Sequence, residues 1–251
     1  MLSHSLSGTV VPLYWPQSIQ FPVSRPRLAS GAAGIEFDVR WTADGVPVVL
    51  HDATLDRTTT GTGPVRSCTC TGLQSLYLLD GRRQPTRWVV PTMHDVIARF
   101  GHRARLFVEV KTDDSPSPEA RGREIARALR SANLPCGPLL LSFAPQALIG
   151  ARETWNTLDT CLLAEPSHSS LGSCPSNLVA EGKDAGASAI GIPDTVVSKV
   201  LVRLAHASGL CVYSWGNLEQ HLIESGLAAC VDLLASDNPG ELARLVRPVS
   251  P

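Results

Sequence analysis

Residues 34–60 read GIEFDVRWTADGVPVVLHDATLDRTTT, and this stretch decides how the rest of the chain is interpreted. It opens with an apolar run in which Glu36 and Asp38 occupy alternate positions. Alternate side chains of a strand point to the same face, so we expect both carboxylates to project into one space. A turn signal at residues 43–45 follows, and a second apolar run leads to His51. The stretch therefore predicts a β-hairpin that brings two carboxylates and a histidine together.

This combination of side chains indicates metal-assisted chemistry. Carboxylate oxygens are the ligands that the hard cations Mg²⁺ and Ca²⁺ prefer. A histidine beside such a cation suits proton transfer, because its side chain titrates near neutral pH. The hairpin alone is compatible with a divalent-metal site, although acids at strand ends also occur in many proteins that bind no metal.

The order of four short motifs makes the stretch more specific. E-x-D, T-x-D-G, V-x-x-H-D and D-R-T-T follow one another within residues 34–63. In this order and spacing they resemble the glycerophosphodiester phosphodiesterase family, and the resemblance continues more thinly to near residue 240. It implies a TIM (β/α)₈ barrel and metal-dependent hydrolysis of a small-molecule glycerophosphodiester to glycerol phosphate and an alcohol. The implied cofactor is a divalent metal, Mg²⁺ or Ca²⁺.

The resemblance also implies roles for individual residues. The metal ligands would be Glu36, Asp38 and Glu109. His51 matches the second of the family's two catalytic histidines, acting as general acid toward the leaving alcohol or as base toward water. The alternative is a structural histidine that closes the hairpin through Asp52. Lys111 would face the phosphate, with an ordinary ion pair to Glu109 as the alternative.

Two further residues belong to the same comparison. Trp215 matches an aromatic residue that the family places at its seventh strand, where it would pack against the glycerol moiety of the substrate. Burial in the core is the alternative role for this side chain. Arg57, from the D-R-T-T motif, lies beyond the strand ends, so we expect it to anchor the local loop.

One motif that the resemblance calls for is missing. The family's first strand ends in H-R-G, which supplies the other catalytic histidine, and E-N-T opens the first helix, but neither motif occurs in residues 1–33. A single general acid or base contributes ~10²–10⁴-fold to a rate. Three hypotheses remain open: an impaired phosphodiesterase, a catalytically inactive relative that binds only metal or phosphodiester, and a chain whose first residues come from a displaced reading frame.

Composition bounds the class of protein. At 251 residues and 43% hydrophobic content, the chain fits one large domain. Lys and Arg number 22 against 23 Asp and Glu, with no basic run, which argues against a nucleic-acid surface. No apolar stretch approaches a membrane span, and residues 1–16 lack the pattern of a signal peptide. Together with scattered cysteines, this favours a cytoplasmic location.

Strands and helices alternate after the hairpin. Apolar strands are predicted at residues 105–111, 139–143, 158–165, 187–192, 210–215 and 231–236. Amphipathic helices are predicted at residues 93–100, 117–134, 144–154, 176–185, 195–208, 218–225 and 239–246. The alternation is typical of a parallel sheet covered by helices. With one strand in the hairpin and one within residues 8–15, the pattern predicts an α/β TIM barrel domain over residues 34–246, with an insertion at about 52–90 and an atypical segment at 1–33.

Overall fold

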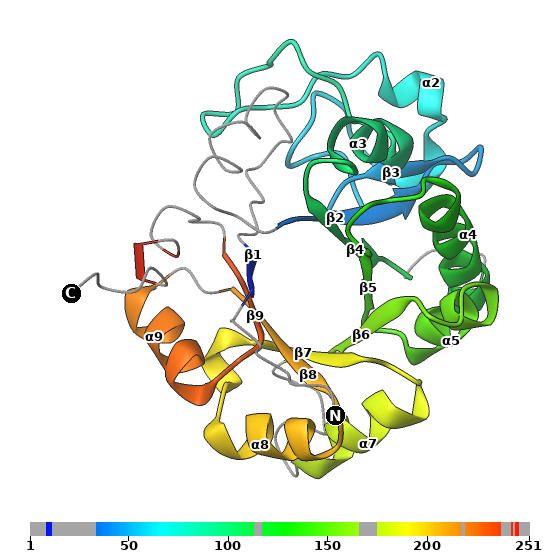
Figure 1. Ribbon diagram of the computed structural model, residues 1–251. Helices are drawn as coiled ribbons and strands as arrows, with labels where there is room; N and C mark the ends of the chain where they lie inside the picture. The colour runs from blue at the N-terminus through cyan, green and yellow to red at the C-terminus, as the bar shows by residue number, and fades with distance from the viewer. Residues whose placement is uncertain are drawn as a thin grey trace.

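The strands form a single nine-stranded sheet that curls into a barrel (Figure 1). The computed structural model describes residues 9–11, 34–112, 117–165, 175–216, 219–236, 242, 244 and 245. The order of the strands in the sheet is β1-β9-β8-β7-β6-β5-β4-β2-β3. Their bounds are β1 Thr9–Val11, β2 Gly34–Trp41, β3 Pro47–Val49, β4 Arg105–Val110, β5 Leu139–Ser142, β6 Asp159–Leu163, β7 Ala189–Pro193, β8 Cys211–Trp215 and β9 Leu233–Ala235.

All strands except β3 run in parallel and follow chain order around the sheet. β3 is antiparallel to β2, and every other pairing is parallel, including that of β1 with β9. The first strand also lies beside β2, where the sheet comes round on itself, although the described backbone contains no ladder between these two (Figure 1). This arrangement confirms the predicted TIM barrel, and its first strand is described at Thr9–Val11. The remainder of the atypical segment, residues 1–8 and 12–33, lies outside the described residues.

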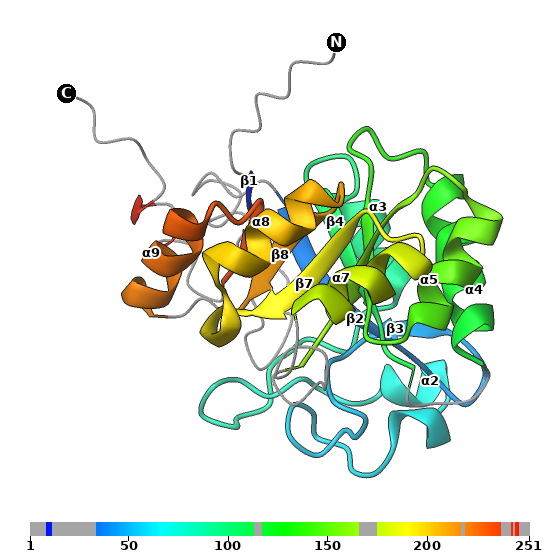
Figure 2. The same cartoon turned by 90° about the horizontal axis from the view of Figure 1, so that it is seen from below.

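Helices surround the barrel and shield the outer face of its strands (Figures 1 and 2). Several of them begin where the sequence supplies a cap: Thr92 and Asp95 form a capping box, and Ser117 caps the helix that starts with Pro118. The helices are α2 Cys70–Leu73, α3 Met93–Phe100, α4 Pro118–Ser131, α5 Pro145–Thr154, α7 Pro175–Asp184, α8 Lys199–Ala207 and α9 Gln220–Ala229, with 3₁₀ turns η1 Val65–Ser67 and η2 Asp194–Val196.

The single helix predicted at residues 195–208 is wrong in one respect. A 3₁₀ turn, Asp194–Val196, precedes α8, and the helix proper begins at Lys199. Ser198 accepts a hydrogen bond from the backbone N–H of Leu201, so its side chain competes with a continuous helix and caps a new one. Of the predicted helix at 239–246, the structure describes residues 242, 244 and 245, and all three are helical.

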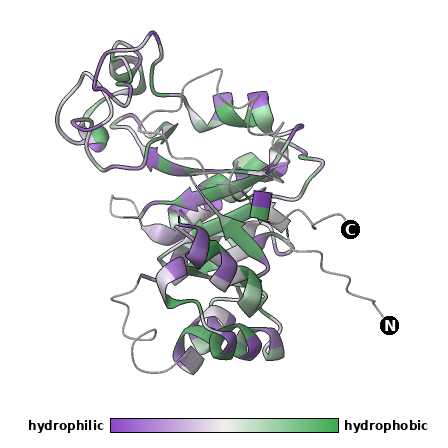
Figure 3. Cartoon of the chain, turned by 90° about the vertical axis from the view of Figure 1, so that its left-hand side faces the viewer, coloured by the Kyte–Doolittle hydropathy of each residue, from purple (hydrophilic) through white to green (hydrophobic). Residues whose placement is uncertain are grey.

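Two apolar layers pack against the parallel strands of the barrel, one on each face. The larger one lies between the strands and the helices, and it contains Phe37, Val39 and Trp41 from β2. The smaller one fills the barrel itself, where Phe107 and Tyr213 stack with ring centroids 6.4 Å apart. Gly191 permits this packing, because a Cβ there would come within 2.4 Å of Leu163. Figure 3 shows the strands as the most hydrophobic part of the molecule.

A long excursion between β3 and α3 has a small core of its own. Its η1 and α2 turns lie at one end of the barrel, away from most of the helices (Figure 2). The buried residues of this third cluster are Val48, Leu50, Leu55, Val65, Leu73, Leu78 and Val90. Since Val48 and Leu50 belong to the hairpin, the excursion is packed directly onto the strand that leads to His51.

Candidate active site

The hairpin at residues 34–52 positions the first group of polar side chains. Val39 of β2 lies opposite Val49 of β3, which confirms the predicted antiparallel pairing. Gly45 takes a φ of +77° in the turn between the strands, a conformation that favours glycine. Asp44 accepts hydrogen bonds from the Thr42 hydroxyl at 2.5 Å and from the Cys70 backbone N–H at 2.9 Å. The turn is therefore tied to the excursion as well as to its own strands.

Three carboxylates converge inside the barrel. Asp38 of β2 pairs in register with Glu109 of β4, so both project from neighbouring strands at the same level. One oxygen from each of Glu36, Asp38 and Glu109 lies within 4.8 Å of the others. Asp38 and Glu109 are buried. The structure thus brings together the three residues that the resemblance implies as metal ligands.

Lys111 neutralises part of this negative charge. Its Nζ lies 2.8 Å from Oδ1 of Asp38 and also forms an ion pair with Oε1 of Glu109. Burial, together with the charge of Asp38, raises the pKa of Glu109 to about 8, although Lys111 acts in the opposite direction. Burial disfavours the charged ammonium of Lys111, but the two carboxylates outweigh it and raise its pKa. The ion pair that was the alternative role of this lysine is therefore present.

The donor set fits a hard divalent cation. All three groups offer carboxylate oxygens, which are the ligands that Mg²⁺ and Ca²⁺ prefer. Oε1 of Glu109 is fully buried, and the ammonium group of Lys111 is the cation that it contacts. A buried carboxylate is costly unless a cation or a hydrogen-bond donor satisfies it. The residues present are thus of the kind that such a cation prefers, and Lys111 supplies a positive charge at the same place.

His51 lies at the end of the hairpin, with 51% of its side chain exposed. Its Nδ1 is 2.8 Å from Oδ1 of Asp52, and its backbone carbonyl accepts a hydrogen bond from Nε of Arg40 at 2.8 Å. Arg57, expected from the sequence to be a loop anchor, forms two hydrogen bonds with Asp52. The contact of His51 with Asp52 was weighed from the sequence, whereas the contact of Arg57 with Asp52 was missed, although both residues belong to the motifs that carry the resemblance.

Trp215 ends β8 and is half-buried. Its ring meets Phe143, the residue after β5, edge to face, with centroids 6.4 Å apart. The indole N–H is buried and has no hydrogen-bond partner among the described residues. Phe143 was also missed, and the available signal was its position directly after a barrel strand, where active-site residues of this fold gather.

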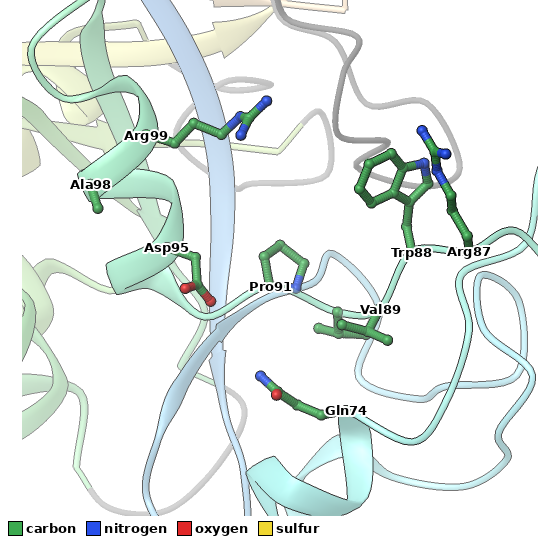
Figure 4. Close-up of a pocket in the computed structure, with 9 residues that line it drawn as sticks. Gln74, Arg87, Trp88, Val89, Pro91, Asp95, Ala98 and Arg99 are labelled. Atoms are coloured by element: carbon green, nitrogen blue, oxygen red, sulfur yellow. The ribbon is translucent and has the colours of Figure 1, made fainter.

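A separate pocket of about 600 Å³ lies between α3 and residues 87–91 (Figure 4). Arg87, Trp88 and Arg99 are among its lining residues, and Asp95 at the start of α3 faces it. The pocket contains none of the carboxylates of the barrel, nor His51. It is therefore distinct from the site that the sequence predicts.

Comparisons with known proteins agree on one family. Residues 27–241 match the model of the glycerophosphoryl diester phosphodiesterase family. Glycerophosphodiester phosphodiesterase 1 from Bos taurus is 30% identical over 146 residues, which cover 57% of this chain and 43% of that relative. The match therefore spans less than half the length of the bovine protein.

Two other likenesses extend along nearly the whole chain. The glycerophosphodiester phosphodiesterase of Caldanaerobacter subterraneus is 29% identical over 233 residues, covering 86% of this chain and 87% of the relative. A solved structure of an Oleispira antarctica phosphodiesterase in complex with the product sn-glycerol-3-phosphate has a TM-score of 0.73 and 21% identity, and the match covers 95% of this chain and 96% of that one. Among the described residues, no helix is long and apolar enough to cross a membrane.

Proposed function

The chain belongs to the glycerophosphoryl diester phosphodiesterase family, and from this premise we propose that it hydrolyses glycerophosphodiesters to glycerol phosphate and an alcohol. The observation that carries the proposal is the cluster of Glu36, Asp38 and Glu109 inside the barrel. The product bound in the Oleispira antarctica enzyme, sn-glycerol-3-phosphate, supports the substrate class.

The cofactor in this proposal is Mg²⁺ or Ca²⁺, held by the three carboxylates. A divalent cation there would polarise the phosphoryl group and balance the charge that develops on its oxygens. The chain supplies a buried environment for Asp38 and Glu109, in which electrostatic interactions are stronger than in water. Lys111 places a second positive charge beside the same carboxylates and is proposed to face the substrate phosphate.

His51 is the proposed acid/base residue. Half of its side chain is exposed, and we propose that the ring meets the substrate, either as acid toward the leaving alcohol or as base toward water. Trp215 and Phe143 form an aromatic edge at the ends of their strands, which suits the carbon skeleton of the glycerol moiety.

A second candidate function is binding without rapid turnover. The specific observation in its favour is that no H-R-G tripeptide, the source of the family's other catalytic histidine, occurs in the 251 residues. Loss of one of two acid/base partners costs ~10²–10⁴-fold in rate. The carboxylate cluster does not depend on that histidine, so binding of metal and phosphodiester would persist.

Hydrolysis of glycerophosphocholine with Mg²⁺ or Ca²⁺ tests both candidates. We expect metal-dependent release of choline, lowered at least about 100-fold by Glu36→Ala and by His51→Ala. Glu219→Ala and His221→Ala are the matched controls for removing a glutamate and a histidine, because these two side chains are 70% and 71% exposed.

The outcomes separate the two functions. No hydrolysis by the unaltered chain, together with stabilisation by metal that Glu36→Ala abolishes, would favour the binding function. No hydrolysis and no effect of metal on stability would overturn both candidates. Full activity in Glu36→Ala would remove the carboxylate cluster from the reaction.

A further inference from the structure

Three side chains at the end of the hairpin and in the excursion that follows it form a series of hydrogen bonds that ends on His51. Nε and Nη2 of Arg57 lie 2.5 Å and 2.8 Å from Oδ2 and Oδ1 of Asp52. Oδ1 of Asp52 in turn lies 2.8 Å from Nδ1 of His51. The guanidinium group of Arg57 therefore binds both oxygens of the Asp52 carboxylate. Such a bidentate contact fixes the orientation of the carboxylate and favours its charged form.

The carboxylate is ionised under all ordinary conditions. Arg57, helped by His51, lowers the pKa of Asp52 to about 2, against a smaller opposing effect of burial. An ionised carboxylate can only accept hydrogen bonds. Nδ1 of His51 must therefore donate to Asp52, and in the neutral ring Nε2 is then the unprotonated nitrogen.

The backbone around these groups is held on both sides. Nε of Arg40 donates to the carbonyl oxygen of His51 at 2.8 Å. Arg83 reaches across the excursion, and its Nη2 lies 3.2 Å from the carbonyl oxygen of Asp56. Leu55, between Asp52 and Arg57, is buried in the small core of the excursion. The geometry of the chain from Arg57 to His51 is thus built into the fold of residues 50–92.

We propose that Arg57 is a positioning residue for the reaction: acting through Asp52, it fixes the tautomer and the orientation of His51, so that Nε2 faces the substrate. This inference rests on the proposed hydrolytic function and on the role of His51 in it. The excursion would then help to position His51 in addition to covering one end of the barrel.

A double-mutant cycle on glycerophosphocholine hydrolysis tests the proposal. Arg57→Ala should lower kcat about tenfold or more, within the ~10²–10⁴-fold that a general acid or base contributes, and should leave KM nearly unchanged. In a His51→Ala background the same substitution should cost nothing further, because the residue through which it acts is gone. A further loss of equal size in that background would overturn the proposal.

Two additional variants separate positioning from a general loss of structure. Arg57→Lys keeps the positive charge but cannot form the bidentate contact with Asp52. Its kcat should therefore lie between that of Arg57→Ala and that of the unaltered protein. Arg123→Ala is the control for removing an arginine that binds a carboxylate, because Nε and Nη2 of Arg123 lie 3.0 Å and 2.6 Å from Oε2 of Glu153, between two outer helices. We expect it to leave kcat unchanged.

A second measurement does not depend on activity. The ¹⁵N chemical shifts of the His51 ring, assigned by their loss in His51→Gln, should report protonated Nδ1 and unprotonated Nε2 in the neutral ring. Arg57→Ala, or Asp52→Asn if the former does not fold, should produce a mixture of tautomers. An inactive protein that shows these shifts would contradict the proposed hydrolysis but not the positioning, whereas an unchanged tautomer in both variants would overturn the positioning itself.

Discussion

Asp38 and Glu109 lie opposite each other on the neighbouring parallel strands β2 and β4, and the ammonium group of Lys111 reaches both carboxylates. Two acids at this spacing in a buried site repel each other strongly unless a cation lies between them. Lysine supplies that charge from within the chain, and the proposed metal would supply it from outside. The stability of this site and its affinity for metal are therefore linked.

Replacing the lysine should separate these two quantities. In Lys111→Met, Asp38 and Glu109 lose their cation, so we expect the metal-free protein to lose up to about 3–5 kcal/mol in free energy of unfolding. Added Mg²⁺ should restore more stability to this variant than to the unaltered protein, because the ammonium no longer repels the cation. Denaturant unfolding with EDTA and with excess Mg²⁺ measures both effects.

The affinity of the same variant for substrate should fall, although its affinity for Mg²⁺ rises. If Lys111 faces the phosphate, its loss raises KM even though the metal is held more tightly. Lys183→Met, at an exposed position on α7, is the control for removing a lysine. Equal stabilisation by Mg²⁺ in the unaltered protein and in Lys111→Met would show that the lysine and the metal do not share a site.

The aromatic edge at the mouth of the barrel gives a prediction about substrate preference. Trp215→Ala removes the ring that meets Phe143 and should raise KM for glycerophosphocholine about tenfold, the loss expected for one packed aromatic contact of ~1.5 kcal/mol. Bis(p-nitrophenyl) phosphate has no glycerol, so its KM should change little. A similar rise in KM for both diesters would assign Trp215 to the core rather than to the glycerol subsite.

The barrel was predictable because its pattern is local. Met93, Val96, Ile97 and Phe100 repeat at helical spacing, and all four are buried in α3, whose bounds match the predicted 93–100. The break before α8 was not predictable from spacing, because Ser198 can either continue a helix or cap one, and only the fold decides between the two.

The site was predictable to the extent that its residues share one strand or one motif. Alternation along β2 places Glu36 and Asp38 on one face, but the pairing of Asp38 with Glu109 depends on the register between strands far apart in sequence. The contact of Phe143 with Trp215 depends likewise on the closure of the barrel. The D-R-T-T motif marked Arg57, yet nothing in the sequence alone shows which acid its guanidinium meets.

A contact far from the chemistry gives a prediction about stability alone. Trp41 is 1% exposed, and its indole N–H donates to Oε2 of Glu124 at 2.9 Å, which joins β2 to α4. The guanidinium of Arg121 lies over the indole, 4.0 Å from the ring centroid. Trp41→Phe loses the hydrogen bond and part of the stacked surface, so we expect a cost of about 1–3 kcal/mol.

Activity per folded molecule should stay unchanged in Trp41→Phe, because the indole lies on the helix side of β2 and not in the barrel. Trp155→Phe is the control: its N–H donates to Thr157 at 2.9 Å in an exposed position, and its loss should cost less than about 0.5 kcal/mol. Equal destabilisation in the two variants would contradict the importance of the link to Glu124.

Acid should weaken the chain of hydrogen bonds that holds His51, and the direction follows from Asp52. Its pKa in the folded protein is about 2, below the ordinary value of 3.8, so its contribution is present above pH 3.8 and disappears as the pH falls through 2. Because the group is partly exposed, we expect that contribution to be on the order of 1 kcal/mol.

Asp52→Asn should therefore be less stable than the unaltered protein at pH 6, and the difference should shrink steadily below pH 4. Urea unfolding at a series of pH values measures it, with Asp159→Asn, whose partner Arg105 lies 3.0 Å away, as an exposed control. A difference between the two proteins that stays constant down to pH 2 would show that Asp52 contributes through packing and not through its charge.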